Sequence, residues 1–390
     1  MIDGPFSPWP CFTEEEARAV EEVLLSNRVN YWTGHQGRDF EREFAESLGC
    51  EYAIAVSNGT VALELALRGL GIGPGDEVIV TSRTFLASAS CIAAVGATPV
   101  FADVDRDSQT ITPATVAAVI TPRTRAIIAV HLAGWPCDMA GLMALSRDGI
   151  AIIEDCAQAH GARYRGQPVG AIGRVGCWSF CQDKILTTGG EGGMVTTSDP
   201  ALWQRMWAYK DHGKSWQAVH DPSPPSGFRW LHYSLGTNWR MAEIPAVIGR
   251  IQLRRLPAWS AARRANAQRI WAAAEACPGL RVPVVPDDIQ HAAYKCYVFV
   301  EPQALHAGWS RDRIIEAVVA RGVPCFSGSC SEVYLEKAFD DTGWRPDTRL
   351  PVARELGETS LMFLCHPTLT EQEIDTTCRV LDDVMAQAAG

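Results

Sequence analysis

The sequence predicts an α/β protein: a large domain with a mostly parallel mixed sheet flanked by helices, followed by a smaller C-terminal α/β domain. Two observations support this prediction. From Tyr52 onward, short β-rich runs alternate with segments of helical length, which is the pattern of a parallel sheet covered by helices. After two long helical stretches, a further β-rich run appears at Cys296–Val300 and a final helix follows. The chain therefore contains a second, smaller α/β unit.

Length and composition exclude several classes of protein. The chain has 390 residues and 47% hydrophobic content, enough for a large core in two or three folding units. Its net charge of −10 disfavours nucleic acid as a partner, because such binding relies on phosphate neutralisation. We find neither a secretory signal nor an apolar run long enough to span a bilayer, and we expect no membrane partner. The 13 cysteines lack histidines at zinc-site spacing, so we expect reduced, mostly buried thiols, no metal and a cytoplasmic location.

The elements can be justified in chain order. An amphipathic helix begins near Thr13, where Thr13 and Glu16 fit a capping box. Six β-rich runs then predict strands of the main sheet: Ala53–Val56, Val78–Val80, Thr98–Phe101, Ala126–Val130, Ile150–Ile153 and Met194–Thr197. The Pro-rich stretch 221–227 predicts a loop, and its Trp- and Tyr-rich flanks indicate that it packs near a functional region.

Helical patterns dominate the region that follows. Two of them, Met241–Leu253 and Pro257–Ala276, lead away from the sheet, and a last helix is capped by Thr370 and Glu373. We therefore predict an N-terminal helical segment at 1–30, a large ligand-binding domain at 31–255, a connecting helix at 256–284 and a small domain at 285–390.

A candidate phosphate site lies at Ser57-Asn58-Gly59-Thr60, where a strand passes into a helix. Free backbone N–H groups at a helix start, a glycine that allows close approach and nearby hydroxyls together suit a phosphate. An ordinary helix N-cap is the competing interpretation. The position after the first strand favours a site, because ligands of α/β sheets bind at the carboxyl ends of the strands.

Asp155 and Lys184 are the candidate catalytic pair. Asp155 follows the apolar run Ile150–Ile153, and Lys184 follows a β-like run and precedes a glycine cluster. A lysine that forms a Schiff base and a carboxylate that keeps the pyridinium nitrogen protonated are what pyridoxal phosphate chemistry needs. A solvated surface charge is the competing interpretation for the lysine. Glu154 should point to the opposite face of its strand.

Two further residues lie near Asp155 in the sequence. Gln158 and His160 are close enough to reach the same cofactor or to orient the carboxylate. A structural histidine in the core is an equally good interpretation of His160.

The motifs together resemble a known family. They are the Ser-Asn-Gly-Thr turn, Gly-Pro-Gly-Asp-Glu-Val at 73–78, Thr84-Phe85, Glu-Asp-x-Ala-Gln-Ala-His-Gly at 154–161, Ser-Phe-x-x-x-Lys at 179–184 and Gly-Glu-Gly-Gly at 190–193. In this order they are similar to the DegT-type sugar aminotransferases, which are fold-type-I pyridoxal phosphate enzymes that aminate nucleotide-linked keto-sugars. The resemblance covers about residues 30 to 255 and continues more weakly to the C-terminus.

The resemblance implies a role for each matching residue. Lys184 would bond to the cofactor, Asp155 would hold the pyridinium nitrogen, and Gln158 would hydrogen-bond the phenolic oxygen. Phe85 would stack on the cofactor ring, although a core aromatic at a helix start is the competing interpretation.

The cofactor phosphate would be held by Gly59, Thr60 and Ser179. The stretch Gly236–Met241 resembles the family's Gly-x-Asn-x-Arg-Met motif, whose asparagine, Asn238 here, would reach the phosphate of the neighbouring subunit. The resemblance therefore implies a homodimer with shared active sites. A cap of the following helix is the other interpretation of Asn238.

The resemblance also implies the reaction. Pyridoxal 5′-phosphate would pass through pyridoxamine 5′-phosphate as an amino group moves from an amino acid, expected to be L-glutamate, to a nucleotide-linked 3-keto or 4-keto sugar of the 6-deoxy hexose type. The product would serve amino-sugar or surface polysaccharide synthesis, such as the O-antigen of lipopolysaccharide. The alternatives are a family relative that acts on a cyclitol or aromatic precursor and a regulatory protein that has lost catalysis.

The expected substrate contacts are Trp32, Lys295 and Tyr297. Many family members have histidine-containing segments where this chain reads Tyr294-Lys295-Cys296-Tyr297, and Cys325–Cys330 is also an unusual loop. These departures leave the cofactor chemistry untouched and bear on the identity of the sugar.

Overall fold

The main structural element is a seven-stranded sheet of order β1-β9-β8-β5-β4-β2-β3. The computed structural model describes residues 6–146, 149–224 and 226–389. The strands are β1 (Tyr52–Val56), β2 (Glu77–Thr81), β3 (Thr98–Ala102), β4 (Thr124–Val130), β5 (Ala151–Asp155), β8 (Val175–Ser179) and β9 (Gly193–Thr197). Six of them agree with the predicted runs to within two residues at either end, and β8 corresponds to the β-like run before Lys184.

The strand directions confirm the predicted mostly parallel mixed sheet. Neighbouring strands from β8 through β5, β4 and β2 to β3 are parallel, whereas β9 runs antiparallel to both β1 and β8. The strands β2, β8 and β9 are buried along their whole length because helices cover both faces of the sheet. The carboxyl ends of β1, β5 and β8 consequently point to the same edge.

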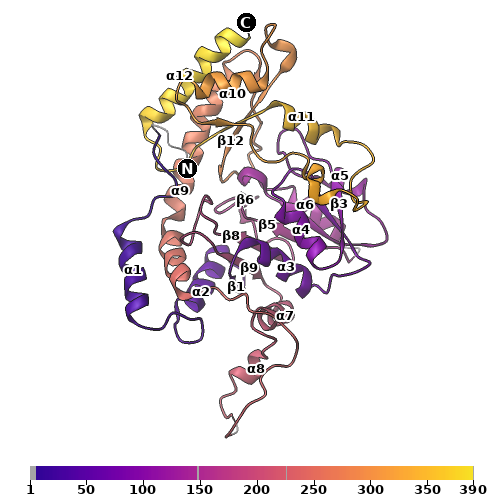
Figure 1. Cartoon of the computed structure of the whole chain (residues 1–390), viewed down its shortest axis with the longest axis vertical. Helices are drawn as coiled ribbons and strands as arrows, with labels where there is room; N and C mark the ends of the chain where they lie inside the picture. The colour runs from indigo at the N-terminus through magenta and orange to yellow at the C-terminus, as the bar shows by residue number, and fades with distance from the viewer. Residues whose placement is uncertain (1–5, 147–148, 225, 390) are drawn as a thin grey trace.

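Helices precede the sheet, alternate with its strands and follow them (Figure 1). They are α1 (Glu14–Leu25), α2 (Gln36–Leu48), α3 (Gly59–Gly69), α4 (Ala87–Ala94), α5 (Pro113–Ala117), α6 (Met139–Leu145), α7 (Pro200–Lys210) and α8 (Trp216–Val219). The predicted capping box of α1 is present, with the Glu16 carboxylate accepting from the Thr13 backbone N–H at 2.9 Å. The short helix α8 and the chain after it project from one end of the molecule (Figure 1).

The prediction of two separate helices around Pro257 was wrong. Residues Glu243–Glu275 form one helix, α9, with Pro257 inside it. The ring removes the N–H that would bond to the Leu253 carbonyl, but Pro257 is exposed, so water can satisfy that carbonyl. Contacts with α1 and α2 on one half of α9 and with α12 on the other hold both halves on one axis (Figure 1). Tertiary packing therefore outweighs the local preference of proline.

The C-terminal region forms a second sheet of order β10-β12-β14-β13, antiparallel throughout. Its elements are β10 (Leu280–Arg281), β12 (Cys296–Val300), α10 (Arg311–Val319), β13 (Cys325–Phe326), α11 (Pro351–Thr359), β14 (Ser360–Phe363) and α12 (Glu371–Ala388). The cap of α12 by Thr370 and Glu373 is confirmed. The domain limits at 30, 255 and 284 stay a prediction.

A third sheet, not predicted from the sequence, joins distant segments. It has the order β11-β6-β7, with β6 (Arg163–Tyr164), β7 (Gln167–Pro168) and β11 (Ile289–Gln290). Its strands are two residues long, too short for a periodic signal. This sheet ties the chain after β5 to the chain that enters the C-terminal region.

Two predictions from composition can be compared with the structure. All 13 cysteines are free thiols and nine of them are buried, as expected. None of the helices in the described ranges has the length and apolar character needed to cross a membrane. Residues 1–5, Pro225 in the predicted 221–227 loop and Gly390 lie outside the described residues.

Candidate active site

A cavity of about 830 Å³ lies at the carboxyl ends of β1, β5 and β8. Eight of the eleven residues predicted for the site line it: Gly59, Thr60, Phe85, Asp155, Gln158, Ser179, Lys184 and Lys295. Three do not: Trp32, Asn238 and Tyr297. The main sheet and the C-terminal region therefore bring together residues that the sequence separates by more than 200 positions.

The turn between β1 and α3 forms one wall of the cavity. Asn58 is the N-cap of α3, and its side chain accepts a 3.0 Å hydrogen bond from the Val61 N–H. The N–H groups of Gly59 and Thr60, at the start of α3, have no acceptor within the helix. The same turn can therefore cap α3 through Asn58 and still bind an anion through the N–H groups of Gly59 and Thr60.

Gly59 is required at this turn by a close approach. A Cβ atom at Gly59 would lie 2.6 Å from the Cβ of Ser179, which is far below van der Waals contact. Ser179 ends β8 and also lines the cavity. The helix start and the end of β8 can therefore form one cradle only because residue 59 has no side chain.

Asp155 is the last residue of β5 and is 5% exposed. Its Oδ1 accepts from the Ala157 N–H at 3.1 Å, and its Oδ2 accepts from the Ser88 hydroxyl at 2.8 Å. Ser88 in turn lies 2.8 Å from the Thr84 hydroxyl. These hydrogen bonds fix the direction of the carboxylate at the cavity wall.

Glu154 points to the other face of β5, as predicted. Its carboxylate lies 3.0 Å from Nε2 of His131 and accepts from the N–H groups of Gly170, Ile172 and Gly173 at 2.7–2.9 Å. The Cys156 thiol lies near enough to complete a metal-type cluster with His131 and Glu154. The donors already fill the carboxylate, so Glu154 is part of the structural frame of the sheet.

Lys184 lies in the cavity near Tyr294 and Asp183, to which the sequence assigned no role. Its Nζ is 5.2 Å from the centre of the Tyr294 ring, and the Tyr294 hydroxyl donates to the Asp183 carboxylate. Although burial opposes the shift, the charge of Lys184 and the Tyr294 hydroxyl lower the pKa of Asp183. From outside the cavity, the Trp9 indole N–H donates to the Lys184 carbonyl at 2.9 Å. The lysine backbone is therefore held from behind while its amine faces the cavity.

Gln158 has a fixed orientation. Its Oε1 accepts a 2.7 Å hydrogen bond from the Ala133 N–H, which leaves the side-chain NH₂ as a donor. His160, in contrast, does not line the cavity. It is fully buried against Trp178 and Phe180, and burial together with the charge of Lys184 lowers its pKa to about 3. The structural interpretation of His160 fits this neutral ring.

Phe85 and Lys295 both line the cavity. Phe85 is 69% exposed, which contradicts the alternative that it is a core aromatic. Lys295 enters from the C-terminal region, directly before β12, and burial lowers its pKa. A cation and an aromatic face are therefore available to a substrate inside the cavity.

Tyr297 and Trp32 lie outside the cavity lining. The Tyr297 hydroxyl accepts from the Ser329 N–H at 2.8 Å, so it supports the loop that carries Gly328 and Ser329 into the cavity wall. The Trp32 ring faces Lys214, whose Nζ is 4.2 Å from the ring centre. Their predicted contacts with substrate stay predictions.

Asn238 is exposed and lies outside the cavity of its own chain. It does not cap α9, whose N-cap is Ala242. A β-bridge to Asp211 and an ion pair of 2.6 Å between Arg240 and Asp211 fix the segment that carries it. The side chain is thus presented outward on a well-supported loop.

Sequence reasoning missed the supporting contacts of the site. Ser88, Asp183 and Ser329 line the cavity but belong to no recognisable motif by themselves. The sequence signals were positional: Ser88 follows Thr84-Phe85 by one helical turn, Asp183 precedes Lys184, and Ser329 lies in the unusual Cys325–Cys330 loop.

Known proteins that are similar to this chain identify its family. The sequence profile of the DegT/DnrJ/EryC1/StrS aminotransferase family matches residues 10–382. The chain is 39% identical, over 98% of its length and 96% of the relative, to the UDP-N-acetyl-3-dehydro-alpha-D-glucosamine 3-aminotransferase of Acidithiobacillus ferrooxidans. It is 37% identical, over 95% of its length and 91% of the relative, to the dTDP-3-amino-3,4,6-trideoxy-alpha-D-glucose transaminase of Streptomyces venezuelae.

A solved structure shares the whole fold. The aminotransferase from Psychrobacter cryohalolentis superposes with a TM-score of 0.96 at 61% sequence identity, covering 98% of this chain and 99% of that one. The match includes both the large sheet and the C-terminal region. The chain belongs to the DegT/DnrJ/EryC1/StrS aminotransferase family and is an aminotransferase.

Proposed function

We propose that the protein uses pyridoxal 5′-phosphate to transfer an amino group from an amino acid, L-glutamate, to a nucleotide-linked keto-sugar. The observation that carries the proposal is the placing of Lys184 and Asp155 in one cavity that also contains the start of α3. Aminotransferases of this family are pyridoxal phosphate enzymes. When bound, this cofactor supplies an electron-accepting ring that stabilises charge on the carbon that loses or gains a proton.

The described residues fit the cofactor. The N–H groups of Gly59 and Thr60 are free to bind its phosphate, together with the Ser179 hydroxyl. Asp155, fixed by Ser88, offers a carboxylate to a protonated ring nitrogen. The Gln158 NH₂ group can donate to the phenolic oxygen, because its Oε1 is already used by Ala133.

Lys184 has two tasks in this proposal. Its Nζ would hold the cofactor at the aldehyde carbon until an amino-acid donor arrives. The free Nζ would also be the base that accepts the proton of the donor α-carbon and the acid that returns it. Phe85, exposed at the cavity, would lie against the cofactor ring and would reduce the access of water to it.

The substrate class is supported by the two relatives named above, which act on UDP- and dTDP-linked sugars aminated at carbon 3. Lys295 is the cavity cation outside the cofactor set, and we propose that it contacts the anionic part of a substrate. A 3-keto sugar, and less directly a 4-keto sugar, is the proposed acceptor. The free thiols are consistent with the reducing cytoplasm as the proposed location.

We also propose a homodimer with shared sites. Asn238 is exposed on a fixed loop, outside the cavity of its own chain. The same region carries several exposed apolar side chains: Phe228, Trp230, Tyr233 and Leu235. Such a patch is typical of a surface covered by a partner chain.

The function is tested by following both halves of the reaction. Adding L-glutamate to the pyridoxal form should bleach the cofactor absorbance, and the resulting pyridoxamine form should aminate one member of a panel of nucleotide-linked 3-keto and 4-keto sugars, detected by mass. Bleaching without any aminated sugar would reject the sugar substrate. No bleaching with any amino acid donor would reject catalysis.

A further inference from the structure

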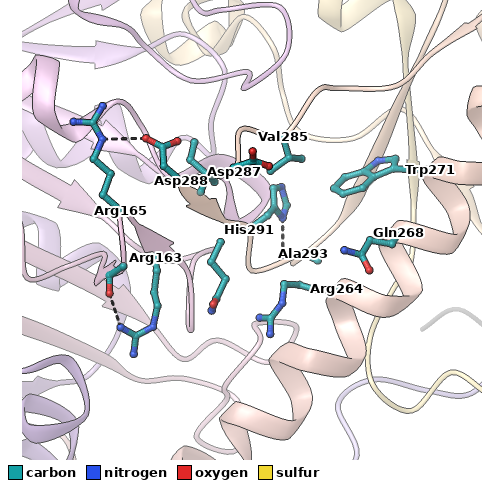
Figure 2. Close-up of a pocket in the computed structure, with 13 residues that line it drawn as sticks. Arg163, Arg165, Arg264, Gln268, Trp271, Val285, Asp287, Asp288, His291 and Ala293 are labelled. Atoms are coloured by element: carbon teal, nitrogen blue, oxygen red, sulfur yellow. Dashed lines mark hydrogen bonds and ion pairs between the residues drawn. The ribbon is translucent and has the colours of Figure 1, made fainter.

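A second cavity, of about 630 Å³, lies between α9, β6 and the segment around β11. Figure 2 shows Arg264, Gln268 and Trp271 on the long helix facing Val285, Asp287, Asp288 and His291 across the cavity. It is distinct from the active-site cavity, although Ala293 lines this one and the next residue, Tyr294, lines the other. Neither the family match nor the proposed reaction assigns it a ligand.

Arg264 is the unusual group of this cavity. It makes neither a hydrogen bond nor an ion pair with any described residue, and its Nη1 is buried without a partner. Burial lowers its pKa, and among the described residues no carboxylate lies close enough to offset this effect. A guanidinium N–H group that has lost water and gained no acceptor is costly, and Nη1 of Arg264 is in this position.

The other charges of the cavity do not supply that anion. Asp288 is paired with Arg165 at 3.0 Å, and Arg163 donates to the Gly166 carbonyl at 2.8 Å (Figure 2). Arg163 and Arg264 therefore face one remaining carboxylate, Asp287, which forms no ion pair within the described ranges. The lining keeps a positive charge in excess.

The rest of the cavity lining contains aromatic rings that could pack against the organic part of a ligand. His291 is 6% exposed, accepts the Ala293 N–H on Nδ1 at 2.7 Å and packs edge-to-face against Trp271. Burial and the charge of Arg264 lower the His291 pKa to about 3, so the ring is neutral and adds no competing charge. An aromatic wall with a few charged groups is typical of small-molecule sites.

We propose that this cavity binds a small organic oxyanion, a phosphate or a carboxylate, through the guanidinium groups of Arg264 and Arg163. A bidentate bond to Arg264 would satisfy the donors that the protein leaves free. Because the site is separate from the cofactor cavity, its occupancy does not depend on the proposed reaction.

The test measures anion binding by the cofactor-loaded enzyme in a chloride buffer, with inorganic phosphate and acetate as titrants in calorimetry. Arg264→Gln should weaken binding at least tenfold. The matched control is Arg269→Gln on the same helix, which removes an ion pair to Asp375 outside the cavity and should bind as the parent does. The tighter of the two titrants identifies the chemical class of the ligand.

A second variant supplies the missing carboxylate from the protein. Residue 268 lies one helical turn after Arg264, so the new carboxylate of Gln268→Glu can pair with the guanidinium. This carboxylate should compete with added phosphate or acetate, and it should raise the melting temperature in chloride buffer that contains neither titrant. Ala272→Glu adds the same charge at an exposed position outside the lining and should do neither. The proposal is overturned if the parent binds neither anion, or if Arg264→Gln and Gln268→Glu bind both anions as the parent does.

Discussion

The Ser88 hydroxyl donates a 2.8 Å hydrogen bond to Oδ2 of Asp155, and thereby joins α4 to the end of β5. The other carboxylate oxygen is held by the Ala157 N–H. The position and direction of the negative charge are therefore set before any ligand binds. Such preorganised charge is usually the largest single contribution to catalysis.

Asp155→Asn should keep the fold but lower kcat by about 100-fold or more, because the charge opposite the ring nitrogen is lost. Ser88→Ala should lower kcat by about tenfold, since it removes one hydrogen bond to a charged group. Steady-state kinetics at saturating cofactor test both variants. Near-normal turnover of Asp155→Asn would show that another group holds the ring nitrogen.

Gly59→Ala should weaken cofactor binding at least tenfold, a loss of about 1.4 kcal/mol. The new Cβ would meet the Cβ of Ser179 at 2.6 Å and force the start of α3 away from β8. Gly73→Ala is the matched control, because the nearest atom to its Cβ would be 3.7 Å away. Equilibrium dialysis against pyridoxal phosphate gives both affinities, and equal affinities would contradict the phosphate cradle.

Stability should fall as the pH drops below about 6.5, the ordinary pKa of histidine. Burial lowers the pKa of both His160 and His291 to about 3. Between about pH 6.5 and 3 each of these imidazoles is protonated in the unfolded chain and neutral in the folded chain. Each ring therefore lowers the free energy of unfolding by about 1.4 kcal/mol for every unit that the pH falls. Urea unfolding from pH 7.5 to 5.5 measures the slope. His291→Asn should reduce the slope by about 1.4 kcal/mol per pH unit. An unchanged slope would show that His291 is protonated in the folded protein.

Mixed dimers test the shared active site. A Lys184→Ala subunit combined with a subunit altered at both Asn238 and Arg240 should recover up to about half of native activity, because both lesions fall in one site and the other is intact. Differently tagged subunits allow the hybrid to be purified. A hybrid no more active than its two parents would refute the proposal.

Part of the site could be predicted from the sequence. Asp155 could be placed because an apolar run ends at it, and the carboxyl ends of parallel strands are where α/β proteins bind ligands. Ser57–Thr60 could be placed for the same reason, because these residues directly follow β1. What local patterns cannot provide is the strand order, which places β8 beside β5 and brings Lys184 near Asp155. That adjacency depends on how the crossover connections pack.

The contributions of the C-terminal region were less predictable. Tyr294 reaches Lys184 from more than 100 residues away, through the packing of β12 and the three-stranded sheet. Pro257 inside α9 shows the same limit, because contacts with α1, α2 and α12 override a local helix breaker. Arg264 could not be singled out among the arginines, since its lack of a partner is visible only in three dimensions.

The most direct measurement of the central claim is to reduce the cofactor-loaded enzyme with borohydride and map the modified peptide by mass spectrometry. The reagent converts the carbon–nitrogen double bond between a lysine and the cofactor aldehyde into a stable amine. Our account predicts a label on Lys184, and a Lys184→Ala variant that binds cofactor without labelling or turnover. A label on another lysine, such as Lys210 or Lys214, or full activity of Lys184→Ala, would contradict it.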